Sequence, residues 1–141
     1  MGEIVNINGE LMPPDKAVIS IYDHGFLFGD SVYEVITTRN GKLYTVQEHL
    51  QRLFNSAKGI YLDIPYSMED LEMEIKKTVK AAGNKDSYVR LMLTRGCGDL
   101  NIDPSSCLKP VLIIIVKEAI QYPEELYTRG MELIISSVKR N

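Results

Sequence analysis

The stretch DHGFLFGDSVYEVITTRNGKLYTVQEHLQRL, residues 23–53, combines a glycine-rich loop, a strand pair and the start of a helix. Residues 32–38 alternate between two sets of side chains and are rich in β-branched and aromatic residues, which predicts a strand. Asn40 and Gly41 suit the two positive-φ positions of a type I′ turn, so residues 42–44 are expected to return as a second strand. This compact unit is one on which a cofactor site can be built.

A helix is predicted directly after the hairpin. Thr45 and Glu48 have the spacing of a capping box, in which each side chain satisfies a backbone donor that the first helical turn leaves free. Apolar residues then recur every three or four positions, which predicts one buried stripe. These residues are Val46, Leu50, Leu53, Ala57 and Ile60, and His49 and Arg52 flank them.

Strands are predicted before this stretch. Residues 4–7 and 10–12 are joined by Asn-Gly, a hairpin signal, and the proline pair that follows cannot continue a hydrogen-bonded ladder. Residues 17–22 are predicted as another short strand.

The second half of the chain repeats both kinds of signal. Ser67 and Asp70 have cap-like spacing, and apolar residues recur at helical intervals up to Gly83, so a second amphipathic helix is expected. Residues 88–94 and 111–116 are predicted strands, and the second is apolar on both faces, as in a buried central strand.

This order of elements predicts an α+β domain with a mainly antiparallel sheet and two amphipathic helices on one face. The domain is expected to span residues 1–118, followed by a connector over residues 119–130. A last strand is predicted over residues 131–138. Because it has no partner of its own, residues 131–141 are interpreted as the beginning of a truncated second domain.

Composition excludes several classes of function. The net charge of −3 offers no basic stripe for nucleic acid, and no apolar run is long enough to cross a bilayer. No signal peptide is visible, so a cytoplasmic location is expected. The histidines and cysteines lack the spacing of metal ligands, and no metal site is predicted. Cys97 and Cys107 are expected to remain thiols.

The motifs DHGFLFGDSVYE and NGKLYTVQEHLQRL resemble the N-terminal half of the class IV pyridoxal-phosphate (PLP) aminotransferases. That superfamily contains branched-chain aminotransferases, D-amino acid aminotransferases and aminodeoxychorismate lyases. The run YVRLMLTRGCGDLNIDP, residues 88–104, extends the resemblance over nearly the whole chain. The resemblance implies PLP as cofactor, an amino acid and a 2-oxo acid as substrates, and a homodimer.

The resemblance also implies roles for single residues. It places Arg52 at the family's phosphate-binding arginine, and a guanidinium fork suits a phosphate better than a point charge does. The alternative for Arg52 is a surface pair with Glu48. Tyr33 and Phe28 are placed near the substrate as walls of an apolar pocket, whereas the alternative is that an aromatic on a sheet face belongs to the core.

Arg90 matches an arginine that lies by the substrate or its supporting network in branched-chain enzymes. An unpaired buried charge is costly, so Arg90 needs a ligand or a partner, and Glu34 is the candidate partner. In the family, the lysine that forms the Schiff base with PLP lies past a segment similar to SSVKRN, and is therefore expected beyond the end of this chain. Lys139 is a candidate substitute, but the resemblance places it before the lysine motif. The chain alone is expected to be inactive.

Two features bear on the subfamily. The loop GCGDLNIDP lacks the arginine and histidine with which D-amino acid aminotransferases capture the substrate carboxylate, and it resembles the branched-chain group. Glu34 is followed by Val-Ile-Thr, as in D-amino acid enzymes and the lyases. We therefore expect amino transfer from a branched-chain amino acid to 2-oxoglutarate. The alternatives are a D-amino acid aminotransferase, an aminodeoxychorismate lyase, or a non-catalytic free-standing domain.

Overall fold

One six-stranded antiparallel sheet, with strand order β2-β1-β6-β5-β3-β4, forms the centre of the computed structural model, which describes residues 2–139. The strands are β1 (Ile4–Ile7), β2 (Glu10–Met12), β3 (Ser31–Arg39), β4 (Lys42–Leu43), β5 (Ser87–Thr94) and β6 (Val111–Glu118). Every pair of neighbouring strands is antiparallel. The predicted α+β class is confirmed.

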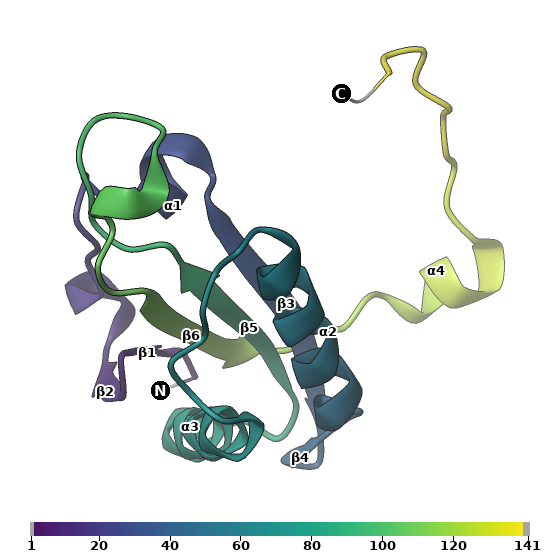
Figure 1. Ribbon diagram of the computed structural model, residues 1–141. Helices are drawn as coiled ribbons and strands as arrows, with labels where there is room; N and C mark the ends of the chain where they lie inside the picture. The colour runs from purple at the N-terminus through teal and green to yellow at the C-terminus, as the bar shows by residue number, and fades with distance from the viewer. Residues whose placement is uncertain (1, 140–141) are drawn as a thin grey trace.

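Two long helices, α2 (Val46–Gly59) and α3 (Met68–Ala82), lie on one face of this sheet (Figure 1). The hydrophobic core lies between them and the strands, because alternate strand residues point toward the helices. On β3, Val32 and Ile36 are buried in this core, whereas Tyr33 lies on the opposite face and is 54% exposed. Burial of the apolar stripe thus decides which way each side chain of β3 points.

Short helical segments complete the described part of the chain. They are α1 (His24–Phe28), α4 (Glu124–Arg129) and two 3-10 turns, Pro14–Lys16 and Pro104–Ser106. The stretch predicted as a glycine-rich loop therefore contains α1, whose first turn is capped by the carboxylate of Asp23 and which ends at Gly29 in the left-handed region. The segment from α4 onward extends away from the sheet (Figure 1).

The turns and the second cap follow the prediction. Asn40 and Gly41 have φ values of 50° and 73°, as a type I′ turn requires. At the start of α3, the Ser67 hydroxyl accepts from the Asp70 N–H and the Asp70 carboxylate accepts from the Ser67 N–H, which is a complete capping box.

The predicted capping box at Thr45 is wrong. Thr45 adopts a left-handed backbone with φ 47°, and its side chain makes no capping hydrogen bond. A capping residue normally has extended backbone, which aims its oxygen at the free N–H groups of the first turn. The sharp entry from β4 into α2 takes Thr45 out of that conformation.

Two predicted strands are also absent from the described residues. Residues 17–22 follow a 3-10 turn and pair with no strand, and Val18 and Ile21 are exposed. Residues 131–138 form no strand either, and each of them is exposed. A strand exists only with a hydrogen-bonded neighbour, and neither segment has one. The division of the chain at residues 118 and 130 stays a prediction, and residues 140 and 141 of its last segment lie outside the described part.

Within residues 2–139, no helix has the length and apolar character needed to span a membrane. The same residues contain no group of three or more His, Cys, Asp or Glu side chains arranged to hold a metal ion.

Candidate functional site

A carboxylate and a guanidinium join β3 to α2. Glu34, 5% exposed, lies on the face of β3 that α2 covers, and it accepts from Arg52 Nε at 2.6 Å and from Arg52 Nη2 at 2.5 Å. The two bonds go to the two carboxylate oxygens, so the pair is bidentate. His49 Nδ1 lies 2.9 Å from Glu34 Oε2. His49 and Arg52 are three residues apart on α2 and therefore share one helix face.

The charges of this cluster support one another. The hydrogen bonds from Arg52 hold the pKa of Glu34 below its ordinary value of 4.5, against the opposing effect of burial, and His49 lowers it further. Glu34 in turn raises the pKa of Arg52. Glu34 is therefore a carboxylate at neutral pH, and it holds Arg52 in one orientation.

The outer side of Arg52 faces solvent. Its side chain is 67% exposed, and its Nη1 makes no hydrogen bond to any residue of the part that the structure describes. Arg52 itself lines a shallow, open hollow together with Gln47, Glu48, Gln51, Asn55 and Met68. A guanidinium that is fixed along one edge and open along the other fits a phosphate group, which takes several N–H donors at once. The predicted alternative, a pair between Arg52 and Glu48, is not the contact that the structure has.

Tyr33 and Arg90 meet on the other face of the sheet. The Arg90 guanidinium lies over the Tyr33 ring, 4.2 Å from its centroid, which is a cation–π contact. Arg90 is paired in register with Val35, and so it points away from the face that carries Glu34. The candidate pairing of Arg90 with Glu34 is therefore wrong. Half of the Tyr33 side chain is exposed, so it is not a core aromatic within this chain.

The outer edge of β3 lies between these two groups. β4 pairs only with Thr38 and Arg39, so residues 31–37 have no strand partner on that side within residues 2–139. Arg52 flanks this edge on the helix side, and the Tyr33–Arg90 pair flanks it on the open side. The two groups are brought to one strand from opposite faces.

Phe28 has a different neighbourhood. It is half-buried on α1, where its ring meets the His24 ring edge-to-face at 4.8 Å. The His24 ring is buried, and its Nε2 lies within hydrogen-bond distance, 2.9 Å, of the Asp99 carbonyl. Phe28 is thus connected to the loop between β5 and β6. Lys139, the candidate substitute for the missing lysine, is exposed.

The contacts of Glu34 were missed at the level of sequence. A signal existed, because Glu34 alternates with Val32 and Ile36 and is thus a carboxylate at a core-facing position, which demands a cationic partner. To choose Arg52 over Arg90 as that partner, one must know on which face of the sheet each side chain lies.

Comparison with known proteins gives consistent matches. A family model described as amino-transferase class IV matches residues 31–141. A putative branched-chain-amino-acid aminotransferase of Methanocaldococcus jannaschii is 38% identical over 136 residues, covering 96% of this chain and 46% of that protein. A D-alanine aminotransferase of Staphylococcus epidermidis is 36% identical over 123 residues, covering 86% of this chain and 44% of that protein. This chain therefore spans less than half the length of these relatives.

Two solved structures share the fold. A branched-chain amino acid aminotransferase from T.th. with pyridoxamine 5'-phosphate has a TM-score of 0.79 and 27% identity, over 86% of this chain and 41% of that chain. The 4-amino-4-deoxychorismate lyase of Pseudomonas aeruginosa has a TM-score of 0.72 and 26% identity, over 89% of this chain and 43% of that chain.

Proposed function

Since the chain belongs to the class IV aminotransferases, we propose that it supplies the phosphate-binding side of a PLP site in an enzyme that moves an amino group between an amino acid and a 2-oxo acid. PLP, when bound, supplies the electron sink for this transfer. The lysine that binds PLP covalently is assigned in this proposal to a part of the protein outside this sequence.

The bidentate contact between Glu34 and Arg52 carries the proposal. Glu34 occupies Nε and Nη2, so the guanidinium cannot turn away and Nη1 stays available to a phosphate oxygen. Fixing the side chain before the ligand arrives reduces the entropy lost on binding. In this assignment Arg52 binds the phosphate, and Glu34 orients Arg52.

Tyr33 and Arg90 are assigned to the substrate side. Arg90 offers a positive charge to a substrate carboxylate, and Tyr33 holds the guanidinium by its ring face while presenting an apolar wall. Phe28 is assigned to the same pocket from the direction of α1.

We further propose a cytoplasmic homodimer. The exposed apolar side chains of Leu100, Ile102 and Leu108 support a protein contact at this loop, and a monomeric mass in solution would contradict it.

We expect Arg52→Gln, in the product of the complete gene, to weaken PLP binding by about a hundredfold, because charged hydrogen bonds to the phosphate are lost. Equilibrium titration followed by PLP absorbance measures this. Arg39→Gln is the matched control, since Arg39 is exposed at the far end of β3. An Arg52 variant with unchanged PLP affinity excludes the assignment.

The proposed amino donor is a branched-chain amino acid, supported by the loop sequence GDLNIDP and by the similarity to the Methanocaldococcus jannaschii protein. The D-alanine aminotransferase relative and the Val-Ile-Thr run after Glu34 favour a second candidate, a D-amino acid donor. Transfer from leucine, isoleucine, valine and D-alanine to 2-oxoglutarate separates the two. Activity with D-alanine alone would replace the first candidate by the second.

A further inference from the structure

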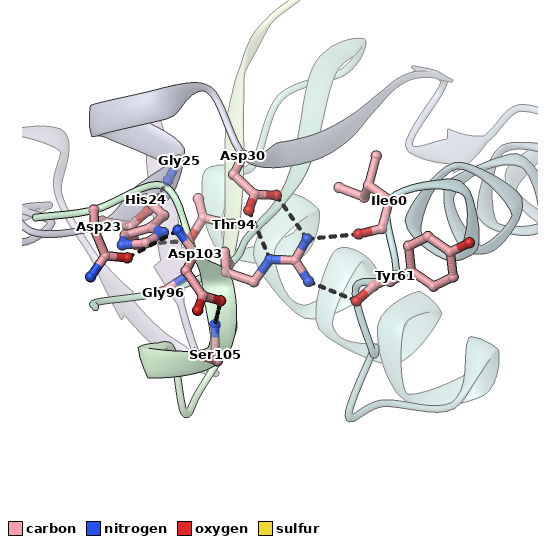
Figure 2. A network of polar contacts seen from close by, with 12 residues as sticks. Asp23, His24, Gly25, Asp30, Ile60, Tyr61, Thr94, Gly96, Asp103 and Ser105 are labelled. Atoms are coloured by element: carbon pink, nitrogen blue, oxygen red, sulfur yellow. Dashed lines mark hydrogen bonds and ion pairs between the residues drawn. The ribbon is translucent and has the colours of Figure 1, made fainter. Parts of the chain in front are cut away.

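Among the described residues outside the proposed phosphate site, Arg95 has the side chain that makes the most hydrogen bonds. It follows β5 directly, its side chain is only 11% exposed, and it donates to four acceptors. Nε and Nη2 bind the two carboxylate oxygens of Asp30 at 2.9 and 3.0 Å. Nη1 binds the Tyr61 carbonyl at 2.7 Å, and Nη2 also binds the Ile60 carbonyl at 2.8 Å. Figure 2 shows these acceptors on two sides of the guanidinium.

The acceptors flank two different elements, β3 and α2. Asp30 immediately precedes β3, and its own carbonyl accepts from the Arg95 N–H at 3.0 Å. Ile60 and Tyr61 are the first two residues after α2. Carbonyls at a helix C-terminus lack partners within the helix and carry partial negative charge, so a buried cation there is favourable. Arg95 therefore fastens the end of α2 to the beginning of β3.

The same two elements are also joined by Glu34 and Arg52. Glu34 lies four residues after Asp30 on β3, and Arg52 lies eight residues before Ile60 on α2, or roughly 12 Å along the helix axis. The buried apolar side chains of α2, Leu50, Leu53 and Ala57, hold this helix against the sheet, and the two polar contacts add directional constraints to that packing. Because the two contacts lie at separate points along α2, together they refine both its axial position and its rotation relative to β3.

We propose that Arg95 is a positioning residue for Arg52: it fixes α2 on β3 so that the open edge of the Arg52 guanidinium faces the phosphate of the ligand. Asp30 completes this arrangement by holding Arg95 at the strand. The proposal rests on the phosphate-binding role of Arg52 and adds the residues that set its position. Groups that bind phosphate must be held to within a fraction of an ångström, and their supporting contacts determine how well.

The test compares two ligands, PLP and pyridoxal, which lacks the phosphate. We expect Arg95→Lys, in the product of the complete gene, to lower the affinity for PLP by about tenfold, because a lysine keeps the charge but cannot hold Asp30 and both carbonyls together. The affinity for pyridoxal is expected to change by less than about twofold. Asp30→Asn is the second variant, and it provides the test in the case that Arg95→Lys does not fold. It should reduce PLP affinity in the same selective way.

Arg39→Lys serves as the control and should leave both affinities unchanged. An equal loss of affinity for PLP and for pyridoxal in the Arg95→Lys variant would mean that Arg95 only stabilises the fold, and this would overturn the proposal. An unchanged affinity for PLP would overturn it as well. Arg52→Gln separates this failure from that of the proposed function. If Arg52→Gln fails to discriminate between the ligands, the phosphate site itself is refuted and the positioning role with it. If Arg52→Gln discriminates and the Arg95 and Asp30 variants do not, only the positioning role falls.

Discussion

Glu34 places a negative charge on the side of β3 that faces the hydrophobic core, and its contacts with Arg52 and His49 compensate for the lost hydration. Because its pKa is lowered in the folded protein, the charge contributes to stability fully above the ordinary value of 4.5. This contribution is lost as the pH falls through the lower value of the folded state. The contact is therefore an acid-sensitive element of this domain.

We expect Glu34→Gln to be less stable than the unmodified chain at pH 7, and the difference between the two to shrink as the pH falls below about 4.5. Urea unfolding at a series of pH values from 7 to about 3 measures it. Asp63→Asn is a suitable comparison, because Asp63 is exposed and makes no ion pair among residues 2–139. A constant difference across the pH range would show that the charge of Glu34 is not what stabilises the contact.

Single residues of the site were predictable to different degrees. The position of Arg52 on the exposed flank of an amphipathic helix follows from helical periodicity. The pairing of Arg90 with Tyr33 depends on strand register, which residue spacing does not determine. Arg95 had no signal of its own, because its acceptors lie 34 to 65 residues away in the chain. Long-range polar contacts of this kind are decided by the fold and not by local sequence.

At the scale of elements, the two helix starts offer a matched pair of substitutions. We expect Ser67→Ala to lower the free energy of unfolding by about 1 kcal/mol, because the capping hydrogen bond to the Asp70 N–H is lost. Thr45→Ala should cost less than about 0.5 kcal/mol, because the Thr45 side chain makes no capping bond. Chemical denaturation of both variants measures the difference. Equal losses would show that the observed cap geometry does not govern stability.

Elements with strong local signals were predicted well, and those that depend on a neighbour were not. Both hairpins, both long helices and the two long strands of the second half follow from periodicity and turn residues. Residues 17–22 have the composition of a strand, but after the 3-10 turn they pair with no strand of the sheet, and Val18 and Ile21 are exposed. Strand formation is a tertiary property, and composition alone does not supply the partner.

For the molecule as a whole, the strand order of the sheet leaves one edge available to the proposed site. β3, β5 and β6 form the continuous centre, β1 and β2 extend one side, and the short β4 leaves most of the opposite edge free. The proposed site uses that free edge. A longer β4 would cover it with a hydrogen-bonded strand, so the shortness of the hairpin is a condition for the proposed function.

The pairing of β1 with β6 joins residues 4–7 to residues 113–116 and so spans nearly the whole described domain. During synthesis, therefore, the first hairpin leaves the ribosome long before its partner strand exists. We expect ribosome-bound chains that have not exposed β6 to be digested readily by a protease, and chains that have exposed it past Glu118 to become resistant in one step. Resistance acquired gradually would contradict this. We therefore expect β1, the strand that is synthesised first, to join the sheet only when β6 is available.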